Sequence, residues 1–471
     1  MTFPPSLRIA VDIGGTFTDT VLVRGQDEIL ASNKNLTTVT NPAEGAREGA
    51  KRVMQQSNCS LEDVSGFIHG TTLATNALIE RQGACVATIT TEGFRDILEI
   101  GYERRYSQYD INLNKTEPLV PRERSFTVRE RVGVDGNTLI SLDPSSLDEL
   151  ISKLDACRAT AVAICLLHSY ANPNHEQALR TALRKHRPDL AISISSEVSP
   201  EAREYERLST TVANAYIQPL MKDYLEQLAG TFSEDGLNCP ILVMTAGGGM
   251  CTLDTAIRFP IRLVESGPAG GAILAAQIAR QAGLDEVLSL DIGGTTAKLC
   301  LIDEGVAQTS RQFEIARAER FIKGSGIPVR IPVIEMIEIG AGGGSIAAVD
   351  RLGRLTVGPR SAGSDPGPAA FDRGGHLPTV TDADVVLGYI PTETFAEGRL
   401  SINTDLAEEV LIREIGSALE LDAVGAADGV SRIVDENMAS AGRMHAVESG
   451  KDLESRTMIA FGGNGPLHAT R

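Results

Sequence analysis

The chain has 471 residues, with 44 Lys and Arg against 62 Asp and Glu, so its formal net charge is −18. Such an acidic surface repels nucleic-acid phosphates and anionic lipid, which excludes a general nucleic-acid or membrane-surface binder but not an anionic substrate at one local site. The 46 glycines, the absence of Trp and the 4% aromatic content predict a globular chain with many tight turns, and exclude collagen, coiled coil and bulk disorder.

Cellular location is predicted from three absences in the sequence. No apolar run reaches the roughly 18 residues of a membrane span, and residues 1–6 lack the pattern of a signal peptide. The 7 cysteines are scattered without a CxxC pair, which favours buried free thiols over disulfides or a zinc site. We therefore expect a cytoplasmic protein without membrane or nucleic-acid partners.

Apolar runs alternate with amphipathic stretches through the first two hundred residues, as is typical of α/β proteins. Asn41 before Pro42 and Asp143 before Pro144 are typical helix starts. Strands are expected at 8–11, 20–23, 66–69, 86–90, 161–167 and 190–195, and helices at 41–56, 73–82, 144–156 and 174–187.

The alternation continues in the remainder of the chain. A long helix is expected over about 200–230, and the segment 266–271, Ser-Gly-Pro-Ala-Gly-Gly, opens a helix over 272–282. Strands are expected at 241–245, 287–290, 299–302 and 457–460, Gly- and Pro-rich loops at 340–378, and mainly helices at 405–450. The whole pattern predicts the α/β class.

One short segment occurs twice. Asp12-Ile-Gly-Gly-Thr-Phe-Thr returns as Asp291-Ile-Gly-Gly-Thr-Thr-Ala, and each copy lies between two apolar strands. Strand, Gly-rich turn and strand form a β-hairpin. Because the surrounding sequences show no equal similarity, we interpret the repeat as a repeated site element rather than a short-period repeat protein.

The chemistry of these turns points to phosphate. Two glycines allow backbone N–H groups to approach phosphate oxygens closely, and the following Thr adds a hydroxyl donor. A carboxylate at the strand end can hold Mg²⁺ or its waters next to the phosphates. A third glycine turn, Gly462-Gly463-Asn464-Gly465, follows the last expected strand and could cradle a nucleoside. One copy alone could be only a tight turn.

The two hairpins and the late glycine turn together resemble the actin-like ATPase superfamily, which includes sugar kinases, heat-shock chaperones and actin. The resemblance implies that Asp12 and Asp291 serve the metal, Mg²⁺ through water, or the catalytic step. It further implies contacts to ATP from Gly14, Gly15, Thr16, Thr18, Gly293, Gly294, Thr295, Thr296, Gly462, Gly463 and Gly465. Lys298, which ends the second copy, could face phosphate, although a solvated side chain is favoured slightly.

Six further sequence motifs narrow the resemblance to the hydantoinase A/oxoprolinase family, and the resemblance runs from about Arg8 to the last residue. These motifs are His69-Gly-Thr-Thr-Leu-Ala-Thr-Asn-Ala-Leu-Ile-Glu80, Ser199-Pro-Glu-Ala-Arg-Glu-Tyr-Glu-Arg207, Ser266-Gly-Pro-Ala-Gly-Gly271, Gly342-Gly-Gly-Ser-Ile346, Ser364-Asp-Pro-Gly-Pro368 and Phe461-Gly-Gly-Asn-Gly-Pro-Leu-His468. The family includes N-methylhydantoinase A, 5-oxoprolinase and the acetone carboxylase β-subunit type.

The resemblance also implies an architecture. We expect two actin-like (ribonuclease H-like) lobes with a nucleotide cleft between them. An N-terminal region over 8–190 would carry the first hairpin, and a hydantoinase A region over 200–471 would carry the second hairpin and the glycine turn. Family members continue well beyond this turn, so we expect the C-terminal part to be truncated. A fragment, a partner that supplies the missing part, and a protein that no longer turns over ATP all remain open.

The activity implied by the family is ATP-dependent hydrolysis of a cyclic amide, a hydantoin, 5-oxoproline or another lactam, with ATP and Mg²⁺ as cofactors. Many members need a hydantoinase B-type subunit, which we therefore expect as a partner, while a homo-oligomer is left open. One alternative is the ATP-handling subunit of an acetone-type carboxylase. Another is a chaperone-like ATPase or a binding-only remnant with the actin fold.

Substrate contacts are expected from His69, Thr71 and Thr72, which lie at a strand end, and from Arg104, in a polar loop with Arg105. A structural role for His69 and a solvated loop for the arginines stay open. Glu204 and Arg207 are expected to form an ion pair on one helix face. Asp365, Asp382 and Asp384 could bind a metal, but caps or turns are the favoured interpretation for each. His445 and His468 show no partner pattern.

Overall fold

The computed structural model describes residues 6–15, 17–25, 28–38, 41–102, 105–113, 115–143, 146–317, 324–363, 365–393, 395 and 401–471. The chain forms two compact units. Unit 1 comprises Met1–Gly267 and Ser310–Val333, and unit 2 comprises Pro268–Thr309 and Ile334–Arg471. The α/β class predicted from the sequence is confirmed in both units.

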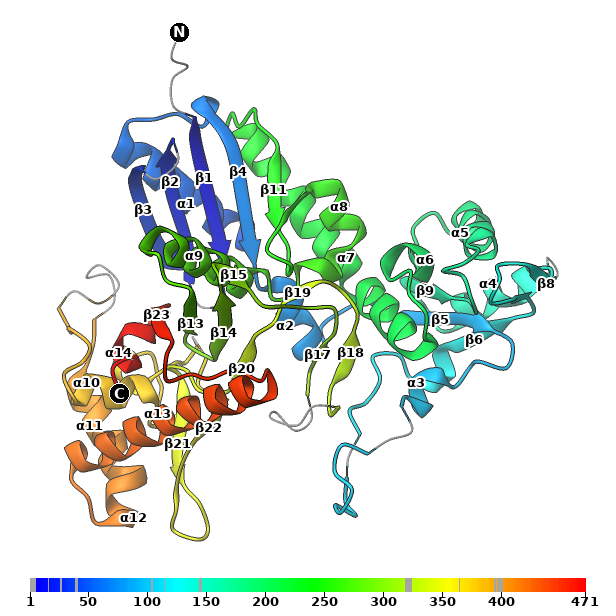
Figure 1. The fold of residues 1–471 in the computed structure, drawn as a ribbon. Helices are drawn as coiled ribbons and strands as arrows, with labels where there is room; N and C mark the ends of the chain where they lie inside the picture. The colour runs from blue at the N-terminus through cyan, green and yellow to red at the C-terminus, as the bar shows by residue number, and fades with distance from the viewer. Residues whose placement is uncertain are drawn as a thin grey trace. The chain divides into compact units, whose positions relative to one another are not determined.

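Unit 1 contains a mixed sheet with the strand order β12-β11-β4-β1-β2-β3. β1 runs antiparallel to β2 and parallel to β4, and α1 covers the β1–β3 side of the sheet (Figure 1). The bounds are β1 (Leu7–Ile13), β2 (Phe17–Arg24), β3 (Glu28–Leu36), β4 (Val64–Thr71), β11 (Ile241–Met244), β12 (Met250–Thr252), α1 (Pro42–Ser57), α2 (Leu73–Ile79) and α8 (Leu253–Arg258). Asn41 caps α1, as predicted, because its side chain accepts the N–H of Glu44.

A second sheet of unit 1 has the order β10-β9-β5-β6, with all neighbours parallel. It has its own apolar core, and α7 packs against β9 and β10. The strands of this sheet are β5 (Val86–Thr91), β6 (Ser125–Val128), β9 (Ala161–Cys165) and β10 (Ala191–Ile194), and β7 (Arg131–Val132) and β8 (Thr138–Ile140) form a separate antiparallel pair. The helices of this part of the chain are α3 (Ile97–Ile100), α4 (Ser146–Ala156), α5 (Asn174–His186), α6 (Ser195–Val198) and α7 (Glu204–Glu234).

Unit 2 repeats the arrangement around the first hairpin. β13 runs antiparallel to β14 and parallel to β23, and β14 pairs antiparallel with β20. The bounds are α9 (Ser266–Ala282), α10 (Val380–Val386), α11 (Thr404–Leu411), α12 (Ser417–Leu419), α13 (Ala423–Glu448), α14 (Gly465–His468), β13 (Glu286–Ile292), β14 (Ala297–Asp303), β15 (Val306–Ala307), β20 (Ile337–Ile339), β21 (Ser345–Val349), β22 (Leu355–Ser361) and β23 (Thr457–Phe461).

The remaining strands are short: β16 (Thr309–Ser310), β17 (Phe313–Ile315), β18 (Ile327–Val329) and β19 (Val333–Ile334). Several segments differ from the sequence prediction, among them the strand β3, which was not predicted, and the segments 340–378 and 266–282. The segment expected as loops over 340–378 contains the antiparallel hairpin β21–β22, whose alternation is obscured by Gly and Pro. The helix expected from 272 begins six residues earlier, at Ser266, because Gly and Pro are tolerated in the first turn of α9.

Candidate active site at two glycine hairpins

The first hairpin turn joins β1 to β2. The N–H of Gly14 donates to the carbonyl of Phe17 (2.9 Å), which closes the turn. The hydroxyl of Thr37 donates to the carbonyl of Gly14 (2.8 Å) and lies 3.1 Å from the hydroxyl of Thr18. Thr18 is fully buried, so its hydroxyl supports the turn from behind through Thr37.

The second turn, between β13 and β14, closes in the same way. The N–H of Gly293 donates to the carbonyl of Thr296 (3.0 Å). Here the support comes from backbone, since Gly343 N–H donates to the carbonyl of Gly293 (3.1 Å). Gly342 must be glycine at this approach, because a Cβ there would lie 2.7 Å from the backbone carbon of Thr295. The repeated segment is therefore a repeated conformation with two different supports.

Both turns present unused N–H groups. Gly15 in the first turn, and Gly294 and Thr295 in the second, are exposed. Within the described residues, their N–H groups donate no hydrogen bond to protein. Exposed backbone donors in a glycine turn are what an anionic phosphate requires. Thr16, the expected hydroxyl donor of the first turn, lies outside the described residues.

A glycine lies beside each aspartate. A Cβ on Gly70, which is paired with Asp12 across β4 and β1, would lie 2.6 Å from Oδ1 of Asp12. A Cβ on Gly462 would lie 2.5 Å from Oδ1 of Asp291. Real Cβ atoms do not approach so closely, so each carboxylate occupies space that only glycine leaves. Gly267, in the first turn of α9, also lies beside Asp12, with 3.6 Å between a built Cβ and Oδ1.

The charges opposite the first aspartate form a row across its sheet. The β-register places Asp19 opposite Asp12 and Lys34 opposite Asp19. The ammonium of Lys34 lies 2.8 Å from the Asp19 carboxylate. Across the first sheet the charges are therefore negative at Asp12, negative at Asp19 and positive at Lys34.

In the second hairpin the charges across the sheet follow a different order: the residue opposite the aspartate is positive and the next residue is negative. Lys298 lies opposite Asp291, and Glu338 lies opposite Lys298, 3.9 Å from its ammonium. The slight preference for a solvated Lys298 is wrong, because its side chain is only 12% exposed. Burial raises the pKa of Asp291, and the positive charge of Lys298 acts in the opposite direction.

His69 lies on β4 opposite Val11, the residue before Asp12, and takes part in a buried chain of hydrogen bonds. Its Nδ1 lies 3.1 Å from the carbonyl of Val11, and its Nε2 lies 2.7 Å from the hydroxyl of Tyr224. A carbonyl can only accept, so Nδ1 carries the proton and Tyr224 donates to Nε2. Burial lowers the pKa of His69 to about 4, which keeps the ring neutral. Full burial and two committed nitrogens favour the structural role that the sequence left open.

Thr71 and Thr72 connect this strand end to its surroundings. The Thr71 hydroxyl accepts the N–H of Leu73 (3.1 Å), at the start of α2. The N–H of Thr72 donates to the carbonyl of Ile13 (3.0 Å), next to Asp12. These bonds hold the end of β4 against the first turn. Direct substrate contact by either threonine stays a prediction.

The third glycine turn follows β23. The N–H of Asn464 donates to the carbonyl of Ile292 (3.0 Å), which places the turn beside the second hairpin. Gly463 is exposed and Gly465 is buried. The turn continues into α14, where His468 lies between the carboxylates of Asp435 (Nδ1–Oδ1, 2.7 Å) and Asp384 (Nε2–Oδ2, 3.3 Å).

His468 is anchored by charge. Burial opposes its protonation, but the bonds to Asp384 and Asp435 outweigh burial and raise the pKa of His468 to about 9. This arrangement was not predictable from the sequence, because the three residues come from α14, α10 and α13. Its effect is to fix the helix that follows the glycine turn.

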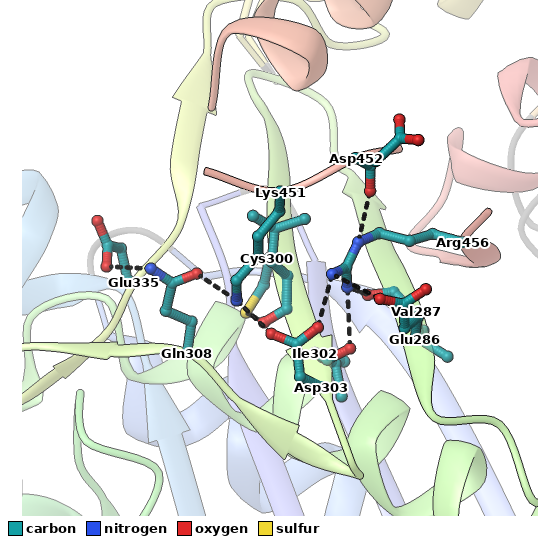
Figure 2. Close-up of polar contacts among 11 residues, drawn as sticks. Glu286, Val287, Cys300, Ile302, Asp303, Gln308, Glu335, Lys451, Asp452 and Arg456 are labelled. Atoms are coloured by element: carbon teal, nitrogen blue, oxygen red, sulfur yellow. Dashed lines mark hydrogen bonds and ion pairs between the residues drawn. The ribbon is translucent and has the colours of Figure 1, made fainter. Parts of the chain in front are cut away.

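A polar network anchors the other end of β23. Figure 2 shows Lys451 and Arg456 converging on Asp303 at the end of β14. Arg456 Nη2 lies 2.6 Å from Asp303 Oδ1, and its Nη1 donates to the carbonyls of Ile302 (3.1 Å) and Val287 (3.3 Å). Since Arg456 is 2% exposed, this network ties β23 to β13 and β14, the strands that carry the second hairpin.

Two of the remaining candidate positions have structural roles. Asp382 closes a capping box with Thr379 at the start of α10, which confirms the cap interpretation. Arg207 is fully buried and donates to the carbonyl of Leu166 (2.8 Å) instead of forming the expected ion pair with Glu204. Arg104 lies outside the described residues.

All 7 cysteines are free, as expected, but only Cys165 and Cys300 are buried, so the expectation of buried thiols holds for these two alone. Within the described ranges, no cluster of three or more His, Cys, Asp or Glu side chains could hold a metal by itself. A magnesium ion held by one or two carboxylates, waters and substrate phosphates does not need such a cluster, so Asp12 and Asp291 fit that donor set. In the same part of the chain, no helix has the length and apolar character to cross a membrane.

Comparisons with known proteins cover nearly the whole chain. The family model for the hydantoinase/oxoprolinase N-terminal region matches residues 8–187, and the hydantoinase/oxoprolinase model matches residues 207–471. An uncharacterised protein of Methanocaldococcus jannaschii is 37% identical over 98% of this chain and 68% of its own length. The caprolactamase subunit alpha of Pseudomonas jessenii is 33% identical over 98% of this chain and 66% of its own length.

Two solved structures share the fold. A chain of nucleotide-free acetone carboxylase superposes with a TM-score of 0.85 at 25% identity, over 99% of this chain and 66% of that one. The ATP-dependent caprolactamase of Pseudomonas jessenii gives 0.81 at 32% identity, over 98% of this chain and 67% of that one. The expected actin-like fold is thereby confirmed. The chain spans about two thirds of the length of these relatives.

Proposed function

The chain belongs to the hydantoinase/oxoprolinase family, and on this premise we propose that it binds Mg-ATP through its two glycine hairpins and uses it to open a cyclic amide. The observation that carries the proposal is the repeated geometry of the hairpins. Each has an aspartate one residue before the end of its first strand, leaves room for the carboxylate beside a glycine, and exposes unused N–H groups in the turn. Generic tight turns need none of these three features.

Each part has a distinct role in the proposal. The N–H groups of Gly15, Gly294 and Thr295 donate to phosphate oxygens, and Asp12 and Asp291 hold Mg²⁺ through its waters. The turn at 462–465 contacts the nucleoside. Since the chain has a net charge of −18, local N–H groups and the metal neutralise the phosphates rather than a general positive field.

Activation by ATP answers the chemistry of the substrate. Amide resonance makes a lactam or hydantoin unreactive towards water. Transfer of the γ-phosphoryl group to the amide oxygen releases ADP and gives an imidate phosphate. Water attacks its carbon, and the C–N bond of the ring breaks as the nitrogen takes up a proton, which leaves an acyl phosphate. A second water hydrolyses the acyl phosphate to the carboxylate and inorganic phosphate. The protein contributes mainly positioning and charge stabilisation to such a phosphoryl transfer.

A partner subunit and a cytoplasmic location complete the proposal. The caprolactamase relative is named as a subunit. We infer that this chain likewise acts with a hydantoinase B-type subunit. The free cysteines agree with a reducing compartment.

A second candidate is the ATP-handling subunit of a ketone carboxylase, which the similarity to the acetone carboxylase chain favours. The same hairpins would then activate bicarbonate or an enolate. The two candidates share the nucleotide site and differ in the substrate that stimulates it.

Phosphate release separates them. The chain is assayed with Mg-ATP, alone and with its hydantoinase B-type subunit, and with either a lactam (caprolactam or 5-oxoproline) or bicarbonate plus acetone. The primary proposal expects release stimulated by a lactam together with the ring-opened amino acid. Stimulation only by bicarbonate plus ketone would replace it with the second candidate. Release stimulated by neither would contradict both.

A further inference from the structure

A cavity of about 360 Å³ lies in unit 1, outside the hairpins and the glycine turn. Its walls come from α5, β10, α6 and α7, and from the chain segment where α8 ends. The charged residues that line it are Arg180, Arg184, Glu197 and Arg258. This volume falls within the range of small-molecule pockets.

The charges around this cavity do not balance. Glu197 Oε2 accepts from both Arg180 Nη1 (2.8 Å) and Arg258 Nη2 (2.6 Å), so one carboxylate serves two guanidinium groups. Arg184, one turn after Arg180 on α5, makes no ion pair or side-chain hydrogen bond with any described residue. Three positive groups therefore face one negative group, in a chain whose overall charge is strongly negative.

The uncharged polar residues that line the cavity, Ser193 and Gln218, are already hydrogen-bonded within the protein. Asn214 Nδ2 donates to the hydroxyl of Ser193 (2.9 Å), and Gln218 Nε2 donates to the carbonyl of Arg258 (3.1 Å). These bonds fix the wall without drawing on the guanidinium groups. The unmatched hydrogen-bonding capacity of the cavity is therefore cationic.

We propose that this cavity is a second ligand site, which takes a small anion that carries a phosphate or carboxylate group. Guanidinium groups bind both anions with paired N–H donors. Arg184 and the outer N–H groups of Arg180 and Arg258 bind the anion, while Glu197 offsets part of the positive charge of the two arginines that share it. The site is independent of the hairpins and of the proposed function.

Isothermal titration calorimetry with inorganic phosphate and, separately, with succinate tests the proposal on the whole chain. We expect Arg184→Gln to weaken binding roughly tenfold, the effect of losing a charged partner. Lys185→Gln is the matched control, because it removes one positive charge from the next residue of α5, which does not line the cavity. Arg184 is exposed, so its replacement leaves the fold intact.

Glu197→Gln distinguishes an anion site from arginines that serve only to stabilise the fold, because only an anion site would bind its ligand more tightly in this variant. It frees two guanidinium groups from their carboxylate, so the anion should bind more tightly than to the unaltered chain. Tighter binding of phosphate or of succinate identifies which anion the cavity takes. No binding of either anion, or equal weakening by Arg184→Gln and Lys185→Gln, would overturn the proposal.

Discussion

Gly70 and Asp12 lie opposite each other on β4 and β1, and a Cβ on Gly70 would lie 2.6 Å from Oδ1 of Asp12. The glycine therefore sets where the carboxylate can lie. In the other unit Phe461 is the register partner of Asp291, and Gly462, the residue after it, has the comparable close approach, with a built Cβ 2.5 Å from Oδ1 of Asp291. The similarity of the two units therefore extends beyond the hairpin, to the end of the parallel neighbour strand.

Gly70→Ala should move the Asp12 carboxylate and weaken Mg-ATP binding by about tenfold or more, which corresponds to ~1.4 kcal/mol. Gly66→Ala on the same strand is the control, because its Cβ would make only an ordinary contact with Arg8 Cγ at 3.4 Å. Titration of both variants with Mg-ATP checks the expectation. Equal affinities in the two variants would show that the position of Asp12 is not set by Gly70.

The neutral state of His69 makes folding stability depend on pH. Its pKa is about 4 in the folded chain and 6.5 ordinarily, so the unfolded chain binds the proton more tightly. The contribution of neutral His69 to the free energy of unfolding is fully present above pH 6.5 and is lost as the pH falls towards 4. The loss amounts to at most about 3 kcal/mol. Urea unfolding at several pH values measures this slope. His69→Gln should flatten it, whereas His186→Gln, at an exposed site on α5, should not.

His468 predicts a dependence of the opposite sign. Its pKa is raised to about 9, so the bonds to Asp384 and Asp435 stabilise the fold fully below 6.5. This stability is lost as the pH rises through about 9. Thermal unfolding of the unaltered chain should show a falling midpoint over that window, and His468→Gln should remove the fall. A midpoint that falls equally in both proteins would mean that other groups cause it.

Lys298 should affect the pH range in which the second hairpin works. Its charge opposes the rise that burial causes in the pKa of Asp291. Lys298→Gln should therefore raise that pKa further and move the acidic limb of Mg-ATP binding to higher pH. Mg-ATP binding curves for both proteins at a series of pH values from acidic to neutral provide the measurement. An unchanged acidic limb would show that the charge of Lys298 does not affect the pKa of Asp291.

The strands around both turns were predictable because each is a short apolar run that stops at an Asp-Ile-Gly-Gly sequence. The strand predicted at 8–11 is β1, Leu7–Ile13, and the strand predicted at 287–290 is β13, Glu286–Ile292. In the structure, each of these two strands continues one residue past its aspartate. Local sequence thus specifies where the carboxylates stand, because it specifies where the strands end.

The supports of the site were not predictable, because they come from distant segments. Tyr224 reaches His69 across 155 residues, from a long helix whose sequence shows no motif at that position. Lys34 lies on β3, a strand that was not predicted because polar residues interrupt its apolar pattern. Strand register, which decides that Lys34 meets Asp19 and Lys298 meets Glu338, is a property of the assembled sheet.

The account depends most directly on Asp12 and Asp291 as the residues that hold Mg-ATP. Their roles are tested by calorimetric titration of Asp12→Asn and Asp291→Asn with ATP, in the presence and absence of Mg²⁺. Asp428→Asn is the control, because Asp428 is half-exposed on α13 and is paired with Arg432 one turn away.

We expect each site variant to lose Mg-ATP affinity by at least about tenfold. ATP without metal should bind them as well as it binds the unaltered chain, or better, because a carboxylate that repels phosphate has been removed. Asp428→Asn should resemble the unaltered chain under both conditions. Undiminished binding of Mg-ATP by both Asp12→Asn and Asp291→Asn would contradict the account.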